Sequence, residues 1–194
     1  MFVGVDDTSR GNDSYVNSRN PVEEVAQRVD HAVDAEISAY SAGHERPLRS
    51  YAAFMATYAS AIGLGSLVAR RRGVHLPERV QFGDLALLAV ATHKTSRLLT
   101  KDSITAVVRA PFTEFVEPIG AGEVQERPRG SSMRHALGEL FGCPFCLGQW
   151  VGTAFVGGFI VAPRATRAVA SVFAVVAASD ALQFAYAGLR KVSE

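Results

Sequence analysis

The fold is decided by an uncharged stretch, residues 51–69, which reads YAAFMATYASAIGLGSLVA. Arg46 and Arg49 precede it, and three consecutive arginines beginning at Arg70 follow it. At about 1.5 Å of helical rise per residue, the stretch nearly matches the roughly 30 Å hydrocarbon core of a bilayer, with the arginines at head-group level. It therefore predicts a membrane-spanning helix.

Two further apolar stretches follow near the C-terminal end. Residues 147–162 are uncharged, residues 165–189 are mostly apolar, and Pro163 and Arg164 stand between them. A proline and a charge between two such runs predict the tight turn of a helical hairpin. These stretches add two more predicted spans.

Residues 82–99 predict a fourth span of a different kind. Leu85 to Ala91 is apolar, but His93, Lys94 and Arg97 follow within two turns. Such charges are tolerated near an interface or against other helices, so we expect this span to be packed inside the bundle. An interfacial or soluble helix is the alternative.

The spans carry small residues at spacings of four, which let helix backbones approach each other in lipid. These are Ala53, Thr57, Ala61 and Gly65 in the first span, Gly148, Gly152, Ala154 and Gly158 in the third, and Ala170, Ala174 and Ala178 in the last. The predicted fold class is all-α, an integral membrane bundle of about four transmembrane helices covering residues 46–194.

The formal net charge of +1 hides two unlike parts of the chain. Residues 1–45 hold nine Asp and Glu against three Arg, a net of −6, whereas residues 46–194 hold seventeen Lys and Arg against ten Asp and Glu, a net of +7. Residues 1–19 are polar and predicted to be disordered. Residues 20–45 predict an acidic soluble helix, with Asn20 as its cap and valines at helical spacing.

The acidic helix is expected to avoid anionic lipid. A protein partner, or self-association through residues 20–40, suits its valine stripe, and the small-residue helix faces offer a second route to a homo-oligomer. Loose packing on the chain's own bundle is the alternative. Nucleic-acid binding is not expected, because no basic stripe is interleaved with aromatic residues.

The loop of residues 100–146 predicts a short helix after Asp102 and a mobile linker at residues 120–132, which are rich in Gly, Glu, Arg and Ser. With four spans, nine Lys and Arg lie on the side of this loop and the termini, against six on the other side. The count predicts a multi-pass protein with both termini in the cytoplasm.

Cys143 and Cys146 form the one chemical motif, CPFC, directly before the third span. Two cysteines at this spacing and at a helix start suit thiol-disulfide exchange, in which both would be catalytic. A zinc site would need two more ligands, and no histidine stands at a diagnostic spacing. A structural pair that shapes the turn is the third interpretation. No metal or cofactor is assigned.

Asp180 lies in the middle of the last span, where an ionised carboxylate is costly unless it is paired, hydrated or protonated. His93, Lys94 and Arg97 are its plausible partners. Either a proton or ion relay or a structural pair that locks two helices would account for it.

Several motifs in one order give the chain a resemblance to a known family. They are Ala91-Thr92 with Arg97-Leu98-Leu99-Thr100, Asp102 and Ile104, then Arg109-Ala110-Pro111-Phe112, then Gly142-Cys143-Pro144-Phe145-Cys146-Leu147-Gly148-Gln149-Trp150. Over roughly residues 83–190 the chain resembles the bacterial membrane proteins grouped as domain of unknown function 1360. The resemblance implies a small integral protein of the bacterial cell membrane, with some relatives labelled as sporulation-related and no established activity. Residues 1–80 look like an addition to the usual short form.

Three functional hypotheses follow. The first is a non-enzymatic membrane scaffold or assembly component, which the sequence favours over an enzyme. The second is a membrane thiol redox protein that uses Cys143 and Cys146. The third is a small transporter component centred on Asp180.

Overall fold

The computed structural model describes residues 20–41 and 46–193, which fall into two compact units, residues 1–46 and 47–194. The first unit contains helix α1 (Pro21–Ser41). Asn20 Oδ1 accepts a hydrogen bond from the backbone N–H of Val22 at 3.1 Å, as an N-cap side chain does. No residue of α1 is buried. The disorder predicted for residues 1–19 concerns residues outside the described ones.

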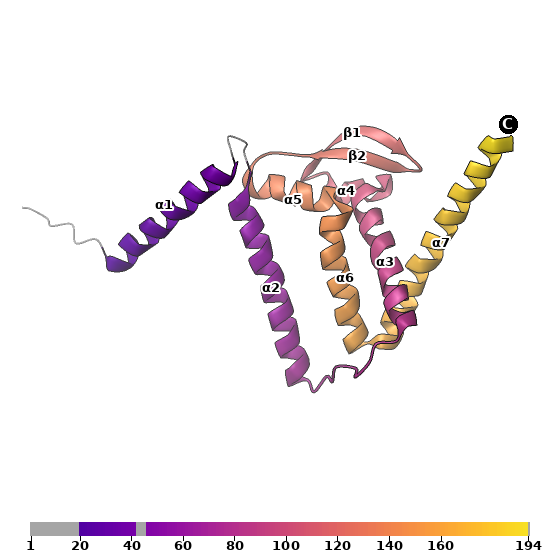
Figure 1. The fold of residues 1–194 in the computed structure, drawn as a ribbon, viewed down its shortest axis with the longest axis horizontal. Coiled ribbons are helices and arrows are strands. Elements are labelled where there is room, and N and C mark those ends of the chain that lie inside the picture. The colour runs from indigo at the N-terminus through magenta and orange to yellow at the C-terminus, as the bar shows by residue number, and fades with distance from the viewer. Residues whose placement is uncertain (1–19, 42–45, 194) are drawn as a thin grey trace, which may run out of the picture. The chain divides into compact units, whose positions relative to one another are not determined.

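The second unit is built on four long helices (Figure 1). They are α2 (Leu48–Arg71), α3 (Phe82–Lys101), α6 (Pro144–Val161) and α7 (Pro163–Ser193). Among the described residues, α2, α6 and α7 are the helices long and apolar enough to cross a membrane. The sequence predicted a fourth such helix at residues 82–99. A helix forms there, but its charged residues keep α3 out of this group.

The core lies where α3, α6 and α7 meet. Helix α6 contributes a buried residue every four positions, so one face of the helix is enclosed, and α3 and α7 cover that face. The buried residues are Leu88, Ala91, Leu147, Val151, Phe155, Phe159 and Ala170. The small residues Gly148 and Gly152 face Ser96 and Thr92 of α3, where an added Cβ would come within 3.8 and 3.5 Å of a side-chain atom.

A small cap joins α3 to α6 at one end of the bundle (Figure 1). It consists of the 3-10 helix η1 (Ser103–Thr105), α4 (Ala106–Arg109), β1 (Thr113–Gly120), β2 (Glu123–Pro128) and α5 (Ser132–Gly142). The strands pair antiparallel from Thr113 opposite Pro128 to Gly120 opposite Glu123. The all-α prediction is therefore corrected to a mostly helical fold with a two-stranded sheet.

The predicted mobile linker at residues 120–132 is wrong, because β1 ends at Gly120, β2 occupies residues 123–128 and α5 begins at Ser132. The chain reverses through Gly120, Ala121 and Gly122, whose φ values of 93°, 49° and 77° are ones that glycine adopts readily. Cross-strand pairing of Glu114 with Arg127 gives the charged residues partners on the sheet. A composition that is typical of a linker forms the turn and the second strand of a hairpin here.

Helix α5 packs closely on the base of this hairpin. The rings of Phe112 and Phe141 are stacked, with centroids 5.8 Å apart and planes 12° from parallel. Gly138 lies so close that an added Cβ would come within 2.5 Å of the Phe112 carbonyl oxygen and 2.9 Å of Pro128 Cα. Only glycine fits at this contact.

Candidate functional site

The two cysteines lie where α5 meets α6. Cys143 precedes α6, and its Sγ accepts a hydrogen bond from the backbone N–H of Cys146 at 3.2 Å, so it caps the helix. Both thiols are free, Cys146 is exposed, and the sulfur atoms are 2.7 Å apart. A disulfide of about 2.05 Å would need only a small approach of the two sulfurs.

Polar groups of α2 and α5 surround this end of α6. His135 Nε2 lies 3.6 Å from Glu139 Oε1, one turn away on α5. The Tyr51 hydroxyl donates to the Glu139 carboxylate and so ties the start of α2 to the cap. Within residues 20–41 and 46–193, no three His, Cys, Asp or Glu side chains gather to hold a metal ion.

Two ion pairs join α3 to α7. Lys94 Nζ lies 2.8 Å from Asp180 Oδ2, and 14% of the Lys94 side chain and 38% of the Asp180 side chain are exposed. Arg167 donates to both Asp84 oxygens, at 2.7 and 2.8 Å. Asp84 precedes Lys94 on α3, and their partners Arg167 and Asp180 follow in the same order on α7, so the two helices run parallel. The two ion pairs therefore fix the axial position of α3 relative to α7.

Of the three partners predicted for Asp180, Lys94 is the one in contact. His93 is exposed on α3. Arg97 points into the cap instead, where its Nε donates to Glu123 Oε1 at 3.0 Å. The Asp84–Arg167 pair was missed by the sequence, since nothing local links residues 83 positions apart.

The Arg109 side chain is fully buried in the cap. Its Nε and Nη2 donate to the two Glu126 carboxylate oxygens at 2.7 and 3.1 Å. The remaining donors reach the Leu99 carbonyl at 3.0 Å, the Thr105 hydroxyl at 2.7 Å and the Asp102 carbonyl at 3.1 Å. All five guanidinium N–H groups are thereby used, as a buried arginine requires. The arginine holds β2, α4 and the end of α3 together.

Asp102 follows the last residue of α3 and lies near the Lys94–Asp180 pair and near Glu123. Burial raises the pKa of its carboxyl; the nearby Lys94 ammonium opposes this effect, and the Glu123 and Asp180 carboxylates add to it. On the exposed hairpin, the Arg127 guanidinium hydrogen-bonded to Glu114 lowers the pKa of that carboxyl. The partner carboxylates in β2 were not among the predicted site residues, because their position depends on the hairpin register.

Trp150 faces α2 from the first turns of α6. Its ring meets Tyr58 edge to face, with centroids 5.1 Å apart and planes at 71°. The Tyr58 hydroxyl accepts a hydrogen bond from Gln149 at 2.8 Å and lies 2.6 Å from Thr153 Oγ1. These contacts attach the middle of α2 to α6.

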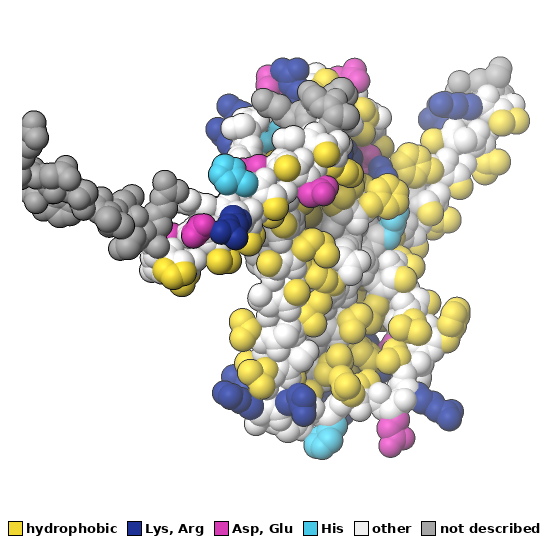
Figure 2. Space-filling model, turned by 60° about the vertical axis from the view of Figure 1, so that its left-hand side comes forward, with side chains coloured by type: hydrophobic (Ala, Val, Ile, Leu, Met, Phe, Trp, Pro, Cys, Tyr) yellow, Lys and Arg dark blue, Asp and Glu magenta, His cyan; other side chains and the backbone are white. Residues whose placement is uncertain are grey.

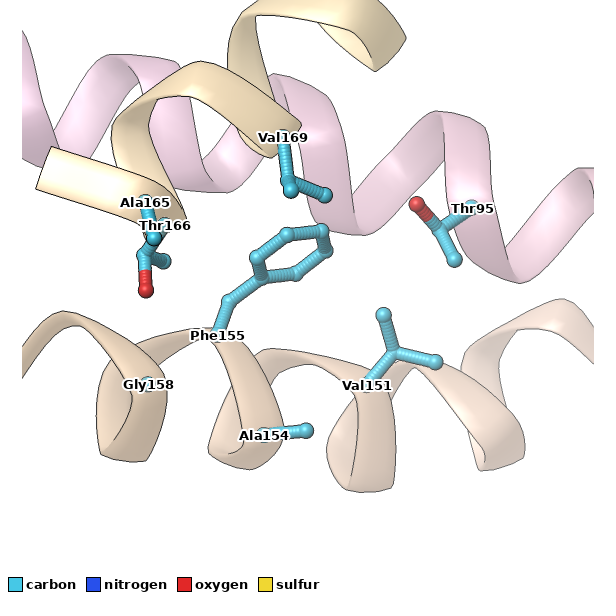
Figure 3. A pocket seen from close by; sticks show the side chains of 8 residues that line it. All are labelled: Thr95, Val151, Ala154, Phe155, Gly158, Ala165, Thr166 and Val169. Carbon is cyan, nitrogen blue, oxygen red and sulfur yellow. The ribbon is translucent and has the colours of Figure 1, made fainter. Parts of the chain in front are cut away.

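A shallow cavity of about 400 Å³ lies among α3, α6 and α7 (Figure 3). Its lining is almost entirely apolar, and the Phe155 ring points from α6 toward Val169 of α7. Thr95 Oγ1 is buried there without a hydrogen-bond partner among the described residues. The cysteines and Asp180 do not line this cavity, so it does not connect the cysteine pair with the Lys94–Asp180 ion pair.

The surface agrees with a membrane environment. Figure 2 shows hydrophobic side chains along the helices, with Lys and Arg gathered toward both ends. Many of the large apolar side chains on α7 are exposed, among them Leu182, Phe184 and Leu189 at 66–71%. The fold and these surfaces define the class: a mostly helical protein with three helices, in the part of the chain that the structure describes, apolar enough to cross a membrane.

The comparisons with known proteins give this class a family. The family model described as "Protein of unknown function (DUF1360)" matches residues 87–186, and the chain belongs to this family. It is 31% identical over 86 residues to "Sporulation protein YjcA" of Bacillus subtilis (strain 168), covering 43% of this chain and 73% of that protein. No solved structure matches the chain significantly. The resemblance found in the motifs is confirmed, and α1 and α2 lie outside the matched residues.

Proposed function

We propose that the chain is a non-enzymatic scaffold or assembly component of a bacterial membrane. The observation that carries this proposal is the pairing of charges between α3 and α7. Asp180 meets Lys94, and Asp84 meets Arg167, within the same bundle. Charges used in this way hold helices in register. A relay group, by contrast, needs access to the ion that it passes on.

The proposal includes α3 as a fourth membrane helix. Its twenty residues measure about 30 Å at helical rise, which equals the hydrocarbon thickness. Its Asp84 and Lys94 side chains are only 10% and 14% exposed, so they are largely sheltered from lipid. With four crossings, α2 begins and α7 ends on the cap side. The basic-residue count favours the cytoplasm for that side.

Side-specific thiol labelling tests this topology. In a chain with both native cysteines changed to serine, single replacements His75→Cys, between α2 and α3, and Ser131→Cys, in the cap, should react from opposite sides of the membrane. Reaction of both from the same side would show that α3 does not cross. Reaction of Ser131→Cys from outside the cell would reverse the orientation.

We infer that α1 is the element that binds a partner, either another protein or a second copy of this chain. Val22, Val25, Val29 and Tyr40 form an apolar stripe along it, and 55–72% of each of these residues is exposed. Glu23 and Glu24 begin the helix, so a basic or apolar surface suits it better than anionic lipid.

Photo-cross-linking in native membranes tests this role. A photoreactive residue at Val29 should give a discrete adduct, and the matched position Gln27 on the opposite face should not. The adduct should persist when Cys143 and Cys146 are both serine. Equal adducts from both faces, or loss of the adduct in the serine variant, would contradict a non-enzymatic partner-binding role for α1.

A second candidate function is thiol-disulfide exchange, which the cysteine geometry favours. Cys146 is exposed, and Cys143 Sγ lies 2.7 Å from its sulfur. Attack by one thiolate of the pair on a client disulfide would release one client thiol and form a mixed disulfide. Attack by the other cysteine of the pair would then release the second thiol, leaving the client reduced and this pair oxidised.

Equilibration of the purified protein in glutathione buffers, followed by thiol alkylation and mass measurement, tests this candidate. A pair that converts fully between dithiol and disulfide supports exchange. Thiols that remain unreactive toward a small alkylating agent would remove it. The single variants Cys143→Ser and Cys146→Ser separate the attacking thiol from the resolving one. A variant that lacks the resolving thiol stops at the mixed disulfide, whereas a variant that lacks the attacking thiol forms no mixed disulfide.

A further inference from the structure

A groove of about 640 Å³ lies between α2 and α6. Its walls are chiefly apolar, with Gly65 of α2 and Gly157 of α6 leaving open space where a side chain would otherwise project. Arg70 lines one end and Tyr58 and Trp150 line the other. The volume falls in the range of about 300–1,000 Å³ that is usual for small-molecule sites. A site here is separate from the cysteines, the ion pairs and α1.

The length of the groove matches one leaflet of a bilayer. Arg70 lies twelve positions after Tyr58, which is about 18 Å along the α2 axis, and half of the hydrocarbon core measures about 15 Å. Arg70 belongs to the last turn of α2, at the end opposite the cap. An extended chain seated in the groove would therefore begin at head-group level and end near the bilayer centre.

The two ends of the groove differ in charge. At the inner end, the Tyr58 hydroxyl, Gln149 and Thr153 bond to one another, so their polar atoms do not require a polar ligand. At the outer end, Arg70 takes part in no ion pair found within residues 20–41 and 46–193, and two more arginines follow it. An amphiphile with an apolar tail and an anionic head complements this arrangement.

We propose that the groove binds an acyl chain of an anionic phospholipid, with the lipid phosphate beside Arg70. The open side of the groove would also admit a transmembrane helix of a partner, and the test below distinguishes that occupant from a lipid. Zwitterionic lipid offers the same tail but a neutral head, so the anionic head is favoured by the charge of Arg70.

Trp150 reports directly on this site, because it is the single tryptophan of the chain and lines the groove. The full chain is reconstituted in phosphatidylcholine vesicles that contain a minor fraction of lipid with brominated acyl chains, which quench tryptophan fluorescence on contact. The brominated lipid is either phosphatidylglycerol or phosphatidylcholine at the same mole fraction. The native chain should show roughly fivefold tighter association with the anionic form than Arg70→Gln shows, from about 1 kcal/mol per basic residue.

Matched variants separate the groove from the general membrane surface. Arg71→Gln removes the same charge from a residue that does not line the groove, so it should keep most of the preference. Gly65→Leu and Gly157→Leu fill the groove from its two walls and should reduce quenching by both lipids. Gly63→Leu, also in open space on α2 but outside the lining, should not.

Three results would overturn the proposal. The first is equal quenching of the native chain by the two brominated lipids. The second is an equal loss of preference in Arg70→Gln and Arg71→Gln, which would assign the effect to general surface charge. The third is protection of Trp150 from both lipids together with a dimer that Gly65→Leu and Gly157→Leu dissociate, which would assign the groove to a second copy of the chain.

Discussion

Replacing Arg109 by Met should open the cap while leaving the helical bundle assembled. Arg109 is fully buried, and the Glu126 side chain that faces it is 6% exposed. The substitution would leave this carboxylate buried without its cation and would remove donors from the Leu99 and Asp102 carbonyls. Breaking a buried pair in this way costs about 3–5 kcal/mol.

Hydrogen exchange of the protein in detergent micelles measures this cost locally. Peptides that cover η1, α4 and the hairpin should lose protection by a factor between about a hundred and a few thousand, the equivalent of 3–5 kcal/mol. Peptides from α6 should change far less, because their core contacts involve α3 and α7. The related variant Glu126→Gln should cost about 1–3 kcal/mol, since its amide N–H₂ would face a guanidinium donor.

A double variant and a surface control make the test decisive. Changing Arg109 and Glu126 together to Met should cost less than the sum of the two single changes to Met. Each single change leaves one buried charge without its partner, whereas the double change removes both charges. Arg127→Gln breaks the exposed pair with Glu114 on the same hairpin and should leave protection close to that of the native chain. Strictly additive costs, or unchanged protection in Arg109→Met, would refute the role assigned to this pair.

Three other substitutions test the packing and the charges. Asp180→Lys should lower the unfolding temperature in detergent, because it places two cations in contact. Adding Lys94→Asp should restore most of the lost unfolding temperature, and a double variant without this recovery would count against the pair. Asp102→Asn should raise the unfolding temperature at neutral pH, because a folded-state pKa above the ordinary value of about 3.9 means that the charged carboxylate opposes folding. The gain should vanish as pH falls below that ordinary value, where both side chains are neutral, and a gain that persists in acid would contradict this cause. Gly138→Ala should destabilise the cap whereas Gly142→Ala, which has open space, should not, and equal unfolding temperatures would argue against the close contact.

The long apolar runs made the helices predictable from sequence. A bilayer-long uncharged segment has to satisfy its backbone hydrogen bonds internally, which leaves the helix as the local solution. Residues 51–69 accordingly fall within α2, and the turn predicted at Pro163 separates α6 from α7. The predicted start of the third span at residue 147 was late by three residues, because Pro144 occupies the first position of α6 and Cys143 caps it.

The cap was not predictable in the same way. Its strands carry Glu and Arg residues that resemble a solvated linker until the partner strand is known. Glu126 becomes the partner of Arg109 only through the hairpin register, and Asp84 meets Arg167 only through the packing of α3 on α7. Contacts of this kind depend on segments distant in the chain, and a single sequence contains no local signal for them.

The link between α6 and α7 limits how the bundle can change shape. Ala162 alone separates the two helices, so their joined ends cannot part by more than a short distance. The Asp84–Arg167 pair lies near this joint, and the Lys94–Asp180 pair lies more than three turns further along α7. A motion that spreads the helices must therefore pivot at Ala162 and open the cysteine end, breaking the Lys94 contact before the Asp84 contact.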